Sequence, residues 1–130
     1  MEFPIDEWRI RAEAVKKQLY PTTGRSRLAG NAMAELDPEF AELIQVVARG
    51  RAYADPTLDL RTRALCTVSC LVALGEQRYI ENWIANAMNA GATKDEIVEI
   101  MVQLFVYVGT SRAVTGFEAA KAVFAERGVL

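Results

Sequence analysis

The apolar residues of this chain recur mainly at the three-to-four-residue spacing that places them on one face of an α-helix. Residues 5–19 show this pattern first, with charged side chains between the apolar ones, and we predict an amphipathic helix there. No segment alternates apolar and polar residues over the length of a strand. The sequence therefore predicts an all-α protein of five to seven helices. The apolar stripe of the first helix consists of Trp8, Ala12, Val15 and Leu19.

Turn-forming residues separate this helix from the next one. Residues 21–27 are rich in proline, glycine, serine and threonine, and we interpret residues 28–36 as a loop with a helical turn. Asp37 followed by proline is typical of a helix start, because the carboxylate accepts a hydrogen bond from a free backbone N–H and proline fits the first turn. We predict a helix from there to about Gly50, followed by a linker over residues 51–57.

The most apolar stretch lies in the centre of the chain. Residues 60–74 contain only two charged side chains, both arginines near its start, which predicts a helix buried on all sides. Gly75 is expected to end this helix in the left-handed conformation, and a second helix follows over about residues 76–90, up to Gly91. The two helices are predicted to form an antiparallel hairpin that is the centre of a single-domain helical bundle.

Two further helices complete the predicted fold. Thr93 and Glu96 have the spacing of a capping box, in which each side chain accepts a hydrogen bond from a free backbone N–H at the helix start. Gly109 is expected to end this helix, and the last helix runs to about Arg127. The sequence contains no internal repeat and no sign of a second domain, so we expect one domain over residues 1–130.

The composition limits the class of partner. The 130 residues are 52% hydrophobic and 25% charged, as expected of a soluble domain, and no apolar run is long enough for a membrane span. The amino terminus lacks the pattern of a signal peptide, and a net charge of −2 gives no basic surface for nucleic acid or an anionic membrane. The apolar helix faces exceed what one core covers. We therefore expect a cytoplasmic homo-oligomer that acts on a small molecule.

The chain contains no histidine, which is the commonest general base and metal ligand. Two cysteines without histidine do not complete a zinc site, so no metal is expected. Cys66 and Cys70 lie four residues apart on the predicted central helix, where their parallel side chains do not favour a disulfide. We expect both to be buried as small hydrophobic residues, with a reactive thiol as the alternative.

Glu76, Tyr79 and Trp83 are the most unusual side chains after the central glycine. Their spacing of three and four residues puts them on one face of the second hairpin helix. Two interpretations remain open. In the first, the three polar-tipped side chains line one cavity at the edge of the core. In the second, Glu76 caps the helix start, Tyr79 has its hydroxyl at the surface, and Trp83 belongs to the core.

Further candidates lie near helix ends or on otherwise apolar helix faces. An arginine in such a place is suited to hold a carboxylate through two parallel hydrogen bonds. Arg63, near the start of the most apolar helix, is expected to pair with a carboxylate of the protein or of a ligand. The full set of these candidates is Arg51, Tyr53, Arg63, Tyr107, Arg112 and Glu118.

Short motifs follow one another in a fixed order over most of the chain. They include RTR at residues 61–63, LVALG at 71–75, NAGATKDEI at 89–97, and Tyr107-x-Gly109. In order and spacing they resemble the carboxymuconolactone decarboxylase family, within the alkylhydroperoxidase D-like superfamily. The resemblance implies a helical fold that assembles as a trimer or hexamer, with small pockets near subunit interfaces. It also implies release of CO2 from an unsaturated lactone acid without a cofactor, so that the protein stabilises a dienolate and supplies a proton.

The sequence departs from that family at the positions that carry its chemistry. On the resemblance, the family's histidine on the second hairpin helix falls on Trp83, and a second histidine falls on Glu118. The CxxC pair of the peroxidase-type members falls on Glu76 and Tyr79, and a glutamate typical of the decarboxylases falls on Arg51. An indole N–H donates a hydrogen bond but does not exchange a proton near neutral pH, so Trp83 does not take over the acid–base role.

Three functions remain open from the sequence, and with them the question of whether the chain is an enzyme. The leading hypothesis is a cofactor-free lyase or decarboxylase-like enzyme for a lactone or carbonyl carboxylic acid, in which Glu76, Tyr79 or Glu118 moves protons. The alternative is a non-catalytic or ligand-binding family member, and a thiol peroxidase-like activity is the third possibility. The residues expected to bind the substrate are Trp83, Arg51, Tyr53, Arg63, Tyr107 and Arg112.

Overall fold

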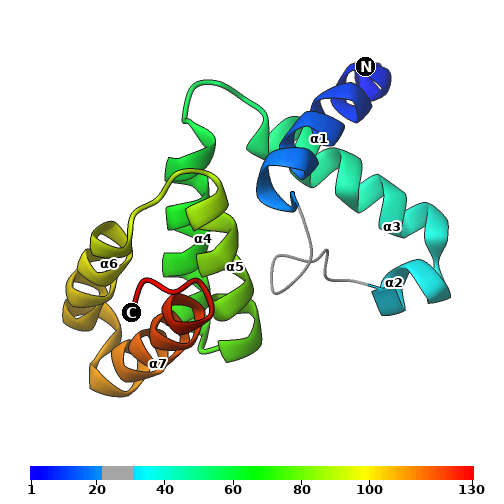
Figure 1. The fold of residues 1–130 in the computed structure, drawn as a ribbon. Coiled ribbons are helices and arrows are strands. Elements are labelled where there is room, and N and C mark those ends of the chain that lie inside the picture. Colours follow the sequence, from blue (N-terminus) through cyan, green and yellow to red (C-terminus); the bar gives the residue numbers. More distant parts are fainter. Residues whose placement is uncertain (22–30) are drawn as a thin grey trace. The chain divides into compact units, whose positions relative to one another are not determined.

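The computed structural model describes residues 1–21 and 31–130. Helices are the only regular elements in this part of the chain, which confirms the predicted all-α class (Figure 1). The chain divides into two compact units, residues 1–60 and 61–130, and each has its own set of helices. The expectation of a single domain stays a prediction. Residues 22–30, where a turn and the start of a loop are predicted, lie outside the described part.

The first unit begins with α1, whose bounds Ile5–Leu19 match the predicted amphipathic helix. The predicted helix start at Asp37 is also confirmed. The Asp37 carboxylate accepts a hydrogen bond from the Phe40 N–H at 3.0 Å and so caps α3 (Pro38–Gln45). The other elements of this unit are α2 (Asn31–Leu36) and the π-helix η1 (Val46–Tyr53).

η1 continues α3 without a break and extends the helical path to Tyr53. The predictions that the helix ends near Gly50 and that a linker starts at Arg51 are therefore wrong. Proline restricts only the residue before it, so Pro56 does not disturb the helix as far back as Tyr53. Gly50 has a different role, because a Cβ there would lie 2.0 Å from the Trp8 carbonyl oxygen. Only glycine lets η1 approach α1 this closely.

The second unit consists of four helices whose ends agree with the prediction to within a few residues. They are α4 (Leu60–Leu74), α5 (Gln77–Asn89), α6 (Lys94–Val108) and α7 (Thr110–Glu126) (Figure 1). α7 packs against both α5 and α6, and all four helices contribute side chains to one hydrophobic core. The largest side chains that this core buries completely are Val68, Val72, Ile80, Ile84, Ile97, Met101 and Val123.

α4 buries only one of its faces, contrary to the prediction. Ala64, Val68 and Val72, four residues apart, are completely buried, whereas Cys66 and Cys70 are exposed. The expectations of a helix buried on all sides and of two buried cysteines are therefore wrong for the chain by itself. An apolar composition indicates which side chains favour burial, but it does not predict how many neighbouring helices will cover them. The three other helices of this unit cover one face of α4.

The turn after α4 and the start of α6 are formed as predicted. Gly75 has a φ of +80°, and its N–H donates to the Leu71 carbonyl at 2.9 Å. At the start of α6, the Glu96 N–H donates to the Thr93 hydroxyl at 3.1 Å, and the Thr93 N–H donates to the Glu96 carboxylate at 2.9 Å. These bonds are the two halves of the capping box.

Glu96 has a second partner, Arg61. The Arg61 Nε donates to Glu96 Oε2 at 3.0 Å, and its Nη2 donates to Oε1, so the ion pair is bidentate. Both side chains are about two-thirds buried, at 38% and 34% exposure. Because the two residues lie in the first turns of α4 and α6, the pair ties the starts of these helices together. The sequence pointed to Arg63 for such a pairing, and not to Arg61.

We predict that the Arg61–Glu96 pair stabilises the fold measurably. A double-mutant cycle with Arg61→Gln and Glu96→Gln should give a coupling free energy of about 1 kcal/mol, since charge-assisted bidentate pairs that are partly buried exceed exposed ones. Glutamine at position 96 keeps an oxygen for the capping box, so the cycle reports the ion pair. The free energy of unfolding is measured in urea.

The exposed pair between Arg9 and Asp6, with an N–O distance of 3.0 Å and Asp6 96% exposed, is the matched control. Its coupling free energy should be close to zero. A coupling at Arg61–Glu96 no larger than at this control would contradict the prediction.

Candidate functional site

The turn between α4 and α5 places two candidate residues at the surface. Glu76 is the residue before α5, but its side chain makes no capping hydrogen bond and its carboxylate contacts no described polar partner. Its backbone carbonyl accepts from the Tyr79 N–H at 3.0 Å, which opens the first turn of α5. Both side chains are exposed, Tyr79 to 42%, and neither makes a hydrogen bond with the described residues. The carboxylate and the phenol are thus available for a ligand.

Arg112, in the first turn of α7, reaches the same turn. Its Nη1 donates to the Leu74 carbonyl at 3.0 Å, and a Cβ on Gly75 would lie 1.5 Å from that nitrogen. The guanidinium therefore rests on the bare glycine backbone. Within the described part of the chain, no carboxylate lies at ion-pair distance from Arg112. We call the group of Gly75, Glu76, Tyr79 and Arg112 the turn site.

Trp83 lies further along α5 and packs against the hydrophobic core, with part of its surface still exposed. It neighbours Ile80 and Ile84, which are completely buried. The ring therefore lies at the border between the core and the face that carries Tyr79. Of the two interpretations of Trp83, the packing favours a role in the core.

The other predicted residues are not brought to the turn site by any recorded contact. Arg63 is half-buried on α4, and Tyr107, near the end of α6, is 80% exposed. Glu118 is exposed on α7, but it lies six residues after Arg112 and so about 240° around the helix from it. Arg51 and Tyr53 belong to the other unit, where Arg51 forms an ion pair with Asp55 at 3.8 Å.

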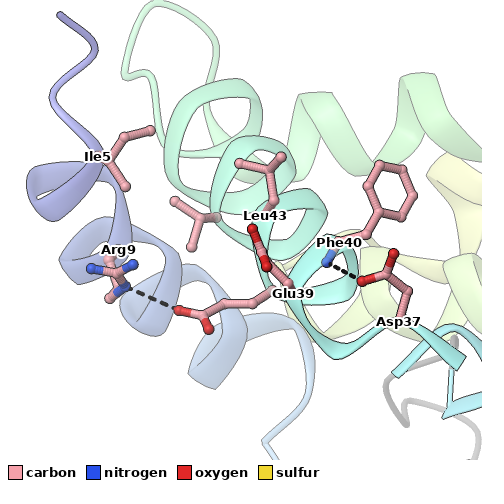
Figure 2. A pocket seen from close by; sticks show the side chains of 8 residues that line it. Ile5, Arg9, Asp37, Glu39, Phe40 and Leu43 are labelled. Carbon is pink, nitrogen blue, oxygen red and sulfur yellow. Dashed lines mark hydrogen bonds and ion pairs between the residues drawn. The ribbon is translucent and has the colours of Figure 1, made fainter. Parts of the chain in front are cut away.

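Two open hollows are formed by described residues of the first unit, and none of the predicted site residues lines either of them. The larger one, about 480 Å³, lies between α1 and α3, and Figure 2 shows Ile5 and Arg9 on one side and Phe40 and Leu43 on the other. The smaller one, about 270 Å³, lies further along α1, between it and the end of α3 with the first turn of η1. It is lined by Arg9, Ala12, Glu13, Lys16, Glu42, Gln45, Val46 and Arg49.

These hollows could not be predicted from the sequence. They exist only because α1 packs against α3 and η1, and nothing local in the sequence shows which residues of two separate helices will face each other. Arg49 is the clearest example. Its Nη2 donates to the Tyr20 hydroxyl at 3.1 Å, a contact that joins residues far apart in the chain.

Two features are absent from the described part of the chain. In residues 1–21 and 31–130, no three side chains of the metal-binding types Cys, Asp and Glu are grouped so as to hold a metal ion. None of the helices in the same residues combines the length and the apolar character needed to cross a bilayer.

Comparison with known proteins gives a consistent result. The model of the carboxymuconolactone decarboxylase family matches residues 38–122, well over half of the chain. A 4-carboxymuconolactone decarboxylase of Acinetobacter baylyi (strain ATCC 33305 / BD413 / ADP1) is 28% identical over 95 residues, which cover 73% of this chain and 71% of that protein.

A second relative comes from Paracoccus denitrificans and is described as an uncharacterized 15.0 kDa protein in the nqo9-nqo10 intergenic region. It is 30% identical over 79 residues, and the match covers 59% of either protein. The match of the family model over both units, together with the helical fold, establishes that this chain belongs to the carboxymuconolactone decarboxylase family.

Proposed function

We propose that this chain is a cofactor-free, lyase-type enzyme that acts on a small lactone or carbonyl carboxylic acid at the turn site. The observation that carries the proposal is the position of Arg112. Its guanidinium rests on Gly75 without a carboxylate partner in the described chain, directly before the unengaged carboxylate of Glu76. Membership in a decarboxylase family, and a relative named as a 4-carboxymuconolactone decarboxylase, support the reaction class.

The proposed reaction breaks the bond between the substrate's carboxylate and the carbon next to it. CO2 leaves, and the electron pair moves into the conjugated carbonyl to form a dienolate. Arg112 is suited to stabilise the negative charge of that intermediate, because its planar guanidinium offers several N–H donors next to a fixed backbone turn. A proton must then reach the dienolate carbon. Tyr79 and Glu76 are the side chains of the turn site that can transfer one.

A non-catalytic, ligand-binding role is the second candidate. The observation in its favour is that Trp83, which on the family resemblance falls on a histidine position, packs against the core, and an indole cannot act as a general acid or base near neutral pH. Under this proposal Arg112 still binds a carboxylate, but no bond is broken. Thiol chemistry is a third candidate only in so far as Cys66 and Cys70 are both exposed.

We also propose that the chain assembles into a trimer or hexamer of identical subunits. An apolar stripe along the outside of α6 supports this, since it has no cover within the described chain. The stripe consists of Val102, Phe105 and Val106, which are 50%, 52% and 73% exposed and lie three and four residues apart. Stripes of this kind are typical of surfaces that pack against another protein.

The enzymatic proposal predicts that the wild-type protein decarboxylates 4-carboxymuconolactone, the acid in the name of the Acinetobacter baylyi relative, or a related lactone acid. Arg112→Gln should lower kcat/KM by roughly 30-fold, about 2 kcal/mol, because the charge that stabilises the dienolate is lost. Arg112→Lys should recover part of it. CO2 release is measured with purified protein, and the melting temperature of each variant shows that the turn is intact.

Arg78→Gln is the matched control, since Arg78 is an exposed arginine in the first turn of α5. It should leave kcat/KM within about twofold of the wild-type value. If lactone acids bind to the wild-type protein but none loses CO2, the ligand-binding role replaces the enzymatic one.

The assembly proposal predicts a single species at the mass of a trimer or hexamer in native mass spectrometry at micromolar concentration. Val106→Glu should shift the protein toward smaller species, because a charge in a buried apolar interface is costly. Ile10→Glu, at a position on α1 that is equally exposed (75%, against 73% for Val106), should leave the mass unchanged. A wild-type protein that is monomeric under these conditions would refute the proposal.

The position of Trp83 generates a separate prediction. Trp83→His should not raise decarboxylation of 4-carboxymuconolactone, since Arg51 and Glu118 also differ from the family pattern and a proton relay needs its partners. Turnover is compared with Trp83→Phe, which keeps most of the packing and should cost less than about threefold. Efficient decarboxylation by the histidine variant alone would mean that the site has diverged far less than its residues suggest.

A further inference from the structure

Arg49 is a half-buried cation on η1 whose charge is not neutralised within the described chain. Its Nη2 donates to the Tyr20 hydroxyl at 3.1 Å, and the centre of its guanidinium lies 4.9 Å from the centre of the Tyr20 ring. These two contacts fix the plane of the guanidinium. No described carboxylate lies within ion-pair distance of it, and its Nε is closed off from solvent without a hydrogen-bond partner. Arginines in such surroundings normally have an anionic partner.

Gln45 lies one helical turn before Arg49, and its side chain also has a buried polar atom without a hydrogen-bond partner. Its Oε1 is closed off from solvent and has no hydrogen-bond partner among the described residues. Both side chains line the smaller hollow, of about 270 Å³. The Gln45 NH2 group, unlike the oxygen, is not closed off from solvent, and it makes no hydrogen bond with the described residues. It and the Arg49 guanidinium are therefore two donors one helical turn apart in the lining of the same hollow.

Among the described residues that line this hollow, Arg49 is the cation without a carboxylate partner. Glu42 accepts from Arg9 at 3.2 Å, and Glu13 lies 4.0 Å from the ammonium of Lys16, so both carboxylates already have cations beside them. Ala12 and Val46, both buried, provide apolar surface in the same hollow. The lining thus combines one unpaired cation, a free amide and an apolar surface.

A close backbone contact holds the two walls of this hollow together. The contact of Gly50 with the Trp8 backbone holds η1 against α1 directly beside Arg49. A π-helix is itself a feature that occurs often at functional sites. A site that is already formed loses little conformational entropy when a ligand enters.

We propose that this hollow, the Arg49 site, binds a small carboxylate and is separate from the turn site. One carboxylate oxygen accepts from the Arg49 guanidinium and the other from the Gln45 amide, while a short apolar group of the ligand contacts Ala12 and Val46. A planar carboxylate fits two donors on neighbouring helical turns. The proposal does not depend on the enzymatic one, because all of its residues belong to the first unit.

The test uses the full-length protein in its native assembly, titrated at constant ionic strength with acetate, benzoate and inorganic phosphate. Binding is followed by calorimetry and by the NMR signals of the Arg49 Nε–H and the Gln45 side-chain amide. We expect saturable binding of benzoate, and weaker binding of acetate, with both NMR signals shifted. Arg49→Met should weaken benzoate binding by at least about tenfold, since the charge-assisted hydrogen bond is lost.

Arg51→Met is the matched control, because Arg51 lies two residues away on the same helix and points into neither hollow. It should change the benzoate affinity by less than about twofold. If Arg49→Met does not fold, Gln45→Leu decides the question, with an expected loss of severalfold. Arg112→Gln should have no effect on benzoate affinity. The two proposals can therefore fail independently, because Arg112→Gln tests the turn site and Arg49→Met tests the Arg49 site.

Three results would overturn the proposal. The first is an Arg49 Nε–H signal that no carboxylate shifts, which would leave ordinary water as the occupant of the hollow. The second is phosphate binding as tightly as benzoate, which would indicate a general anion site without selection for a planar group. The third is an equal loss of affinity in the Arg49 and Arg51 variants, which would place the binding elsewhere.

Discussion

Gly75 satisfies two structural requirements, one of backbone conformation and one of space, and the fold of the second unit depends on both. The backbone there has a φ of +80°, which a side chain makes unfavourable, and the space where a Cβ would lie is occupied by the Arg112 guanidinium. The glycine therefore lets the chain reverse direction between α4 and α5. It also leaves room for the first turn of α7 to contact this turn through Arg112. Through the hydrogen bond from Arg112 to the Leu74 carbonyl, one position fixes three helices. It also decides where the candidate site lies, because Glu76 and Tyr79 follow directly.

Membership in the carboxymuconolactone decarboxylase family settles the family of this chain but does not by itself settle its chemistry. On the family resemblance, the family's histidines fall on Trp83 and Glu118, and this chain contains no histidine. What remains at the turn is an arginine with no carboxylate partner, a free carboxylate and a free phenol. These groups are suited to bind an acid and to stabilise an enolate. The proposed reaction is therefore of the family's type, but it does not use a histidine as the acid–base residue.

Features set by neighbouring residues in the chain could be predicted from the sequence. The bounds of α1, the cap at Asp37, the glycine turn at position 75 and the capping box of Thr93 and Glu96 all follow from short-range hydrogen bonds. Their signals are contained within one or two helical turns, so no knowledge of the tertiary fold is needed.

Features that depend on which helices meet could not be predicted. The exposure of Cys66 and Cys70 depends on how many helices cover α4, and the choice of Arg61 over Arg63 as the partner of Glu96 depends on how α4 and α6 lie together. The extension of the helix through η1 requires the close contact of Gly50 with α1. For the same reason the sequence pointed to Arg112 as a candidate but not to the turn on which it rests.

We propose that the turn site recognises the carboxylate of the substrate. A structure of the full assembly with a bound lactone acid tests this proposal most directly. A crystal structure with 4-carboxymuconolactone or a non-reactive analogue should show the ligand within hydrogen-bond distance of the Arg112 guanidinium, with Glu76 or Tyr79 facing its ring. A ligand bound only at the Arg49 site, with Arg112 still donating to Leu74 alone, would contradict the central claim.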